Sequence, residues 1–423
     1  MKKRVLAILL AACTALSFVP AFASEVVNAD VTGDILIYHH LAEMVGIFDE
    51  FIADIRIKYP NITIEQELQK ESSTLQVKYA SGDDPDIVIG PQTQQYIELG
   101  KYQDLSQMPG IDRLDKLCYD IVYDPNLDGI YKVPLCNRSG GLFYNKEIIE
   151  ELGLDAPTTW DEWVEDMKTI KAAMPDVVPY YIYNNAHALA YVGFGTQMLE
   201  VGPVELQWAM NRNDSEILQF DKPGGYVETF AQRLMDLLEA NLIDSELAIV
   251  GNDDMGYEMF ATNRVAYVTS GTFWYSGCVQ RFPDSAEKFG LWPMPATVDG
   301  MGQFTVAGPD SAVSVSATDP DQEAIAIILQ ELFSEKFLKA YSEKRGAPAA
   351  FSGVESDWST LVEDVQYNWE NFPIITQMTP VTGFGFSDIA KFQQELLVGT
   401  YTPAEWAAEF LNRWDTAYTN SSR

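Results

Sequence analysis

The stretch "IYKVPLCNRSGGLFYNKEIIEELGLDAPTTWDEWVEDMKTI", residues 130–170, decides the fold. Its first part, 133–143, has the extended apolar character of a buried strand. Residues 156–172 then predict an amphipathic helix, in which Thr159 and Glu162 form the pattern of a capping box, each side chain bonding the other residue's backbone N–H. The apolar face of this helix is expected to pack in a core and comprises Trp160, Trp163, Val164, Met167 and Ile170.

The letters just before this stretch resemble the start of a calcium loop. "DPNLDG", residues 124–129, fits D-x-[DN]-x-[DN]-G. A full loop needs a bidentate carboxylate at its twelfth position, which is Leu135 here, and its ninth position is Lys132, a poor neighbour for a cation. We therefore predict that Asp128 and Gly129 form a turn into a strand, and we predict no metal site.

The N-terminus has the pattern of an export signal. "MKKR" is basic, "VLAILLAA" is a short apolar core, and "AFA" before Ser24 fits signal-peptidase cleavage, which makes 1–23 a signal peptide. The alternative is a lipobox, "LAAC" at 10–13, in which Cys13 would carry a lipid. Cleavage before Ser24 is favoured, because Cys13 comes early and the apolar stretch continues after it. Both predict an exported chain, periplasmic or at the extracellular cell surface.

Charge and length limit the classes of function. The net charge is −34, and removal of Lys2, Lys3 and Arg4 with the signal takes it to −37. Such a surface repels nucleic acid and anionic headgroups, and it argues weakly against anionic ligands, although a local site can override it. About 400 mature residues predict two domains. After cleavage before Ser24 the mature chain keeps an odd set of cysteines (Cys118, Cys136 and Cys278), which allows either one disulfide or three buried thiols.

Periodicity predicts alternating strands and helices. A buried strand at 34–40 is followed by a helix that Pro60 stops, a strand at 61–68, a further helix and a short strand at 87–89. This order is typical of the α/β class. Further helices are predicted at 226–241, 320–341 and 403–418.

Signatures of enzyme chemistry are missing from the sequence. It contains no G-x-S-x-G, H-E-x-x-H or P-loop motif. Histidine occurs only as His39, His40 and His187. His39 and His40 follow each other at a strand end, so their side chains point to opposite faces, which suits a single ligand contact better than joint metal binding.

With these features in view, residues 130–170 closely resemble the extracellular solute-binding proteins of ABC importers, the branch that includes maltose-binding protein. Four further blocks resemble segments of that family in the same order. They are "ASGDDPDIVIG" (80–90), "MFATNRVAYVTSGTFW" (259–274), "FGLWPMPATVDG" (289–300) and "AIAIILQELFSEKFLKAYSEKRGAPAA" (324–350). The family segment that residues 259–274 resemble has the form F-x-x-Gk-AM-x-x-x-G-x-W, and Asn263 here replaces its usual glycine.

The resemblance implies a two-lobed α/β fold of the type II-like periplasmic-binding-protein class, with the ligand between the lobes. Its expected parts are an N-lobe of 25–136 plus 309–347, a C-lobe of 140–303 plus 350–423, and hinge segments at 135–140, 303–309 and 347–350. It implies a monomer that binds a sugar or oligosaccharide, closes its lobes, and is recognised by the permease subunits of an ABC transporter. Neither catalysis nor a cofactor is expected. The alternatives are a non-sugar solute (a polyamine, a peptide or glycerol-phosphate) and an extracellular glycoside hydrolase.

Matching positions give candidate ligand contacts. Trp274 is matched to the tryptophan of G-x-W, a stacking platform in that family. The remaining candidates lie at predicted strand ends, at the hinge or near the C-terminus, and they are His39, His40, Gln92, Gln94, Asn137, Arg138, Tyr183, Asn184, Asn185, His187, Phe384 and Phe386.

Overall fold

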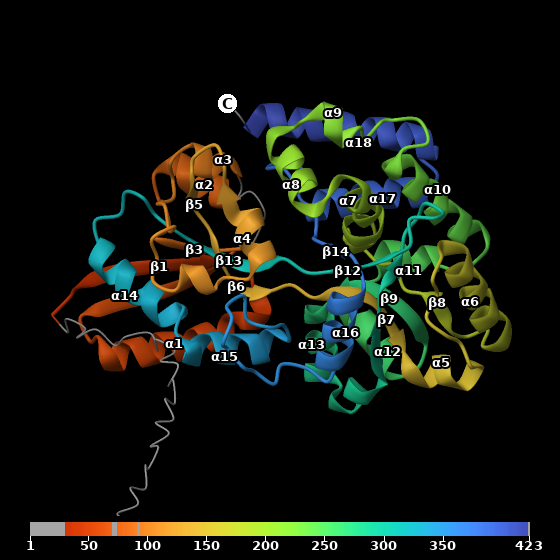
Figure 1. Cartoon of the computed structure of the whole chain (residues 1–423), viewed down its shortest axis with the longest axis horizontal. Coiled ribbons are helices and arrows are strands. Elements are labelled where there is room, and N and C mark those ends of the chain that lie inside the picture. The colour runs from red at the N-terminus through yellow and green to blue at the C-terminus, as the bar shows by residue number, and fades with distance from the viewer. Residues whose placement is uncertain (1–29, 70–73, 91–93, 422–423) are drawn as a thin grey trace, which may run out of the picture.

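The chain folds into two α/β lobes that lie side by side and are joined by extended segments (Figure 1). The structure is a computed structural model, which describes residues 30–69, 74–90 and 94–421. The predicted signal peptide and Cys13 therefore lie outside the described residues. The prediction of a two-lobed α/β fold is confirmed.

The N-lobe is built on a mixed sheet. Its strands, in spatial order, are β2 (Ile62–Leu68), β1 (Gly33–His39), β3 (Ile87–Ile89), β13 (Pro309–Val315) and β6 (Val133–Asn137). Strands β2, β1 and β3 run parallel, and β13 is antiparallel to both β3 and β6. The carboxyl ends of β1 and β3 therefore lie next to each other, at the edge of the sheet where ligands bind in open α/β folds.

Helices cover both faces of this sheet. They are η1 (Ala42–Met44), α1 (Val45–Lys58), α2 (Thr74–Ser81), α3 (Gln94–Glu98), η2 (Ile111–Arg113), α4 (Lys116–Val122), α14 (Gln322–Leu332) and α15 (Glu335–Arg345). Side chains of β1 alternate between the two faces. Ile37 packs with α1, α14 and α15, whereas Tyr38 packs under α2 and α3 beside Leu75 and Tyr96.

The C-lobe sheet contains most of the remaining strands. Its path is β11 (Met294–Pro295), β12 (Gln303–Val306), β7 (Gly140–Asn145), β9 (Val265–Gly271) and β8 (Val178–Tyr180), with β10 (Phe289–Trp292) on β7 and β14 (Ile374–Ile375) on β12. Helices surround it: α5 (Lys146–Leu152), α6 (Trp160–Ala173), η3 (Ala188–Gly193), α7 (Phe194–Val201), α8 (Pro203–Arg212), α9 (Ser215–Leu218), α10 (Tyr226–Glu239), α11 (Ser245–Val250), α12 (Asp253–Ala261), α13 (Thr272–Arg281), η4 (Pro283–Lys288), α16 (Val362–Asn371), α17 (Phe386–Leu397) and α18 (Pro403–Ser421). Among the described residues, no helix is both long and apolar enough to cross a bilayer.

Two of the segments that join the lobes are hydrogen-bonded to each other. One leads from β6 to β7 and the other from β12 to β13. The N–H of Gly308 donates to Oδ1 of Asn137 at 2.7 Å, and the N–H of Arg138 donates to the carbonyl of Gly308 at 2.6 Å. The two crossings therefore form one paired unit.

The third connection departs from the expected 347–350. Gly346, with φ +67°, ends α15 in the left-handed conformation and turns the chain back along β6. Ala349 bridges Cys136, and Phe351 still packs in the N-lobe core. The C-lobe core begins with Trp358, so the chain crosses after Phe351.

Two local predictions also differ from the structure. The start of α6 is capped by Thr159, which accepts from the N–H of Glu162 at 3.2 Å, but the Glu162 carboxylate accepts from the N–H of Thr158 rather than that of Thr159. The single helix predicted at 320–341 is two helices, because Ser334 interrupts it and caps α15 by accepting from the N–H of Phe337 at 3.3 Å.

Candidate functional site

A cleft of about 640 Å³ lies between the lobes. Its N-lobe wall and the floor at the crossing segments contain His40, Gln69, Leu75, Gln76, Gly90, Tyr96, Ile121, Lys132, Arg138, residues 309–312 and Arg345. Its C-lobe wall contains His187, Gln207, Phe273, residues 376–383 and residues 385–387. This volume falls within the range of about 300–1,000 Å³ that is usual for small-molecule sites.

The two neighbouring histidines take different positions, as their alternation predicts. His39 is 0% exposed, hydrogen-bonded to Gln66 at 2.9 Å and packed on Phe48, so the structure places it in the N-lobe core and not in the cleft. His40 lines the cleft. Gly90, at the end of β3, has φ +100°, and a Cβ there would lie 2.0 Å from His40 Cε1, so only glycine leaves room for this ring.

A buried ion network forms the floor of the cleft. Arg138 Nη2 contacts one oxygen of Asp310 at 2.9 Å, and Arg345 contacts the other through Nε and Nη2 at 3.1 and 3.0 Å. Arg345 also bonds Glu43 through Nη1. Burial alone would raise the pKa of Asp310, but Arg345 and Arg138 outweigh it and hold that pKa well below its usual range. Asp310 thereby joins one crossing segment to another and to the end of α15.

His187 occupies the C-lobe wall directly before the π-helical turn η3. Its ring lies 5.3 Å from that of Phe273, in an edge-on arrangement. Burial, reinforced by the nearby charge of Arg138, lowers the pKa of His187 to about 4. A neutral imidazole can both donate and accept a hydrogen bond, which suits a ligand hydroxyl.

The lowered pKa of His187 predicts an acid sensitivity. An unfolded histidine titrates near pH 6.5, so between about pH 6.5 and pH 4 the unfolded chain binds a proton that the folded site rejects, and stability falls as pH falls through this window. We expect His187→Gln to lose less stability than the native chain between about pH 7 and pH 4.5, measured by urea unfolding. Other titrating groups, His40 included, are common to both proteins. Equal losses in the two would contradict this assignment.

Phe273, and not Trp274, presents an aromatic ring to the cleft. Trp274 is 0% exposed and packs among Tyr257, Phe260 and Phe289 at ring distances of 5.2–5.8 Å, so the structure corrects its expected placement on the cleft wall. Phe273 is half-buried, lines the cleft, and has the Arg345 guanidinium 5.3 Å from its ring centre. In the motif G-x-W the aromatic residue is the second after the glycine, which from Gly271 is Phe273 and not Trp274. This spacing could have identified Phe273 from the sequence.

Most other predicted contacts hold the structure together instead of lining the cleft. Gln94 is buried and donates to Asp124 at 2.6 Å. Tyr183 is buried against Tyr181 and donates its hydroxyl to Asp253. The Asn137 side chain accepts from a backbone N–H between the two crossing segments. None of these three belongs to the cleft wall.

The remaining candidates divide between the cleft and its surroundings. Asn184 is exposed, and Asn185 accepts from the His187 N–H at 3.0 Å. Phe386 lines the cleft with Arg138 and His187, whereas Phe384 is 4% exposed and packs on aromatic rings of α17 and α18. Gln92 lies outside the described residues.

The former calcium candidate is a hairpin turn. Strands β4 (Tyr123–Asp124) and β5 (Gly129–Ile130) pair antiparallel, and Asp128 adopts φ +51° between them. Asp124 accepts from the N–H groups of Asn126 and Leu127 at 2.8 and 3.2 Å. Across 30–69, 74–90 and 94–421, no group of three or more metal-ligating side chains is suitably placed for an ion.

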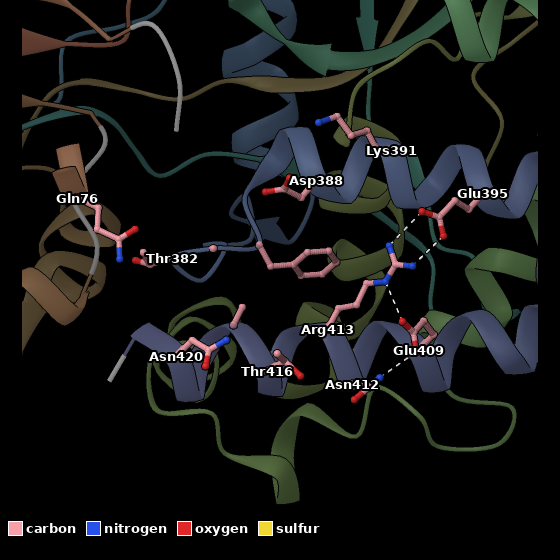
Figure 2. Close-up of a pocket in the computed structure, with 13 residues that line it drawn as sticks. Gln76, Thr382, Asp388, Lys391, Glu395, Glu409, Asn412, Arg413, Thr416 and Asn420 are labelled. Atoms are coloured by element: carbon pink, nitrogen blue, oxygen red, sulfur yellow. Dashed lines mark hydrogen bonds and ion pairs between the residues drawn. The ribbon is translucent and has the colours of Figure 1, made fainter. Parts of the chain in front are cut away.

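A second pocket, also about 640 Å³, continues from the cleft between α17 and α18. Gln76, Thr382 and Gly383 line both spaces, and Gln76 reaches in from α2 of the opposite lobe (Figure 2). Within this pocket, Arg413 bonds Glu409 at 2.9 Å and Glu395 at 2.8 Å. Because these charges satisfy one another, the pocket offers a polar extension of the cleft.

Comparison with known proteins agrees with this architecture. The chain is 25% identical over 332 residues to the multiple sugar-binding protein of Streptococcus mutans, which covers 76% of each chain. It is 22% identical to the melibiose/raffinose/stachyose-binding protein of Bacillus subtilis over 67% of this chain and 65% of that one. Its fold is similar to the crystal structure of a sugar transporter protein from Bacillus licheniformis in complex with stachyose, with a TM-score of 0.74, 19% identity, and coverage of 91% and 100%. The model of one family matches residues 41–347, and by this match the chain belongs to the bacterial extracellular solute-binding proteins.

Proposed function

We propose that this chain captures a sugar or oligosaccharide in the interlobe cleft and delivers it to the permease of an ABC importer. The carrying observation is the composition of the two walls. Phe273 and Phe386 supply aromatic surface, and His40, His187 and Gln207 supply polar atoms from both lobes. Aromatic faces pack on the apolar side of a sugar ring, while imidazoles and amides bond its hydroxyls. The sugar-binding relatives support the same class of ligand.

Transport follows from lobe closure. The crossing segments at 137–140 and 306–309 are short and paired, so they can act as a hinge about which the walls approach. A ligand favours the closed form only to the extent that it binds that form more tightly. The closed, monomeric protein is then the form that the permease recognises, and no chemical reaction is required.

The charges in the cleft disfavour two alternatives. Among the described residues that line it, Asp310 is the single carboxylate, and both of its oxygens are bound by arginines. A polyamine needs several available carboxylates, and glycoside hydrolysis needs two flanking the scissile bond. The described lining provides neither.

Thermal melting against a panel of solutes tests the proposal. The panel holds neutral oligosaccharides such as raffinose and stachyose together with acidic oligosaccharides and sugar phosphates, and spermidine and calcium are comparators. A ligand at about 100 times its Kd stabilises the folded form by about 2.7 kcal/mol, which raises the melting midpoint by several degrees. We expect such a shift with one set of sugars. A shift with spermidine alone, or with none of the sugars, would overturn the proposal.

Export and anchoring need a separate measurement. We propose that the chain is exported and cleaved before Ser24, free of a membrane anchor. The mass of the exported protein distinguishes the two possibilities. A mature chain that begins at Ser24 supports this proposal. A mature chain that begins at a lipid-bearing Cys13 would contradict it and show that the protein is tethered to a membrane.

A further inference from the structure

The cleft is cationic, although the protein as a whole is strongly acidic. Its described lining contains Lys132, Arg138 and Arg345 against the single carboxylate of Asp310. Even when Glu43, the outer partner of Arg345, is included, one positive charge remains. The whole chain carries 62 acidic and 28 basic residues. The described lining therefore carries a charge opposite in sign to that of the molecule.

Of the three cations in the described lining, Lys132 is the one that has no ion-pair partner among the described residues. Arg138 and Arg345 both bind Asp310, but Lys132 makes no hydrogen bond or ion pair within the described part of the chain. The carboxylate that acts on it electrostatically is Asp124, which already accepts from Gln94 and from two backbone N–H groups.

The position of Lys132 makes this unpaired charge significant. It directly precedes β6, at the opposite end of that strand from the crossing to β7, and it is partly buried in the N-lobe wall. Burial lowers the pKa of Lys132, and Asp124 offsets part of that effect. An ammonium group in a wall that loses water when the lobes close is unfavourable without a partner. The Nε of Arg138, at the floor, is also buried without a hydrogen-bond acceptor among the described residues.

We propose that the cleft selects sugars carrying an anionic group, a carboxylate or a phosphate, and that Lys132 binds this group. The inference rests on the proposed sugar-binding function and specifies its ligand class. An ammonium–anion contact in a partly dewatered cleft is several times stronger than in bulk water. The rest of the sugar then lies toward Gln76, which lines both the cleft and the adjoining pocket.

The acidic surface does not oppose this selection at the site itself. At physiological salt the field of exposed charges decays over about 8 Å. Repulsion from the surface therefore slows the approach of an anion, mainly at low salt, while the local pair with Lys132 sets the affinity. The weak expectation from net charge, that anionic ligands are disfavoured, applies to the surface and not to the cleft.

Calorimetry with matched pairs of sugars tests the proposal. The pairs are galactobiose with digalacturonate, xylotriose with its glucuronic-acid-substituted form, and glucose with glucose 6-phosphate. We expect the acidic member of at least one pair to bind about tenfold or more tightly than its neutral partner. Lys132→Met should remove this preference, with a loss of about 10- to 100-fold for the acidic sugar and less than about threefold for the neutral one. Lys132→Arg should retain most of it.

Lys116→Met provides the matched control. It removes the same charge from the same lobe, at a side chain that is 85% exposed and outside the cleft. The control should keep the preference, and the melting midpoints of all variants confirm that they are folded. Preference within the first two pairs identifies a carboxylate, and preference within the third identifies a phosphate. Neutral sugars that bind as tightly as acidic ones, or a preference that survives Lys132→Met, would overturn this inference alone. Failure of every sugar to bind would overturn the proposed function itself.

Discussion

Replacement of Asp310 by asparagine is expected to lower the free energy of unfolding by about 3–5 kcal/mol. The carboxylate is buried and bridges Arg138 and Arg345, which are 16% and 8% exposed. An asparagine of the same shape leaves two guanidinium groups close together without their shared counterion. The loss arises mainly from these uncompensated charges. An intact buried ion pair adds little net stability, but removal of one partner leaves a buried charge without compensation, which is costly.

Urea unfolding of the purified protein measures this loss, and two comparisons sharpen it. Asp54→Asn removes a carboxylate from a surface pair with Lys336 and should change stability by less than about 1 kcal/mol. A triple variant, Arg138→Met, Asp310→Leu and Arg345→Met, removes the charges together and should recover much of the stability. A change below about 1 kcal/mol in Asp310→Asn would show that the network does not hold the hinge region together.

Trp274→Ala should mainly lower stability, whereas Phe273→Ala should mainly weaken sugar binding. Trp274→Ala removes a fully buried ring from the C-lobe core and is expected to cost about 3–5 kcal/mol of stability. Phe273→Ala truncates a half-buried ring on the cleft wall, so stability should fall by about 1 kcal/mol or less. It should weaken sugar binding by about 10-fold or more, because a stacked aromatic surface is lost.

The two variants together separate packing from recognition. Urea midpoints give the stability of each, and calorimetry with a sugar from the melting panel gives affinity at a temperature where both are folded. The assignment predicts that Trp274→Ala, once folded, binds nearly as well as the native chain. Loss of binding in Trp274→Ala with normal binding in Phe273→Ala would restore the tryptophan as the ligand platform.

The sequence carries the fold because its local signals agree with its long-range pattern. Alternating strands and helices, the cap at Thr159, and the buried face of α6 all appear in the structure. The opposed directions of His39 and His40 follow from strand geometry alone. The third crossing was misplaced because residues 347–351 add to the edge of β6, and only long-range pairing fixes that position.

The site was less predictable than the fold, because it depends on the direction in which each side chain points around its helix and on contacts between residues far apart in the sequence. A helix begins at Thr272, so the neighbours Phe273 and Trp274 point in directions about 100° apart, and a motif match cannot tell which one faces the ligand. Gln94 and Tyr183 are polar residues near strand ends, yet both are bound by carboxylates far away in sequence. Residues 376–383 and Lys132 carried no motif for ligand binding, and their role follows only from the assembled cleft.

The three cysteines of the described chain make it a suitable host for a fluorescent reporter of sugar. Cys118, Cys136 and Cys278 are all buried and unpaired, and burial raises the pKa of each thiol, to about 11 for Cys278. The thiolate is the form of cysteine that reacts, so maleimide dyes should not label these three buried thiols. A cysteine introduced at the exposed Asn184, beside the cleft wall, would then be labelled alone without removal of any native thiol. Its fluorescence would report lobe closure directly in solution.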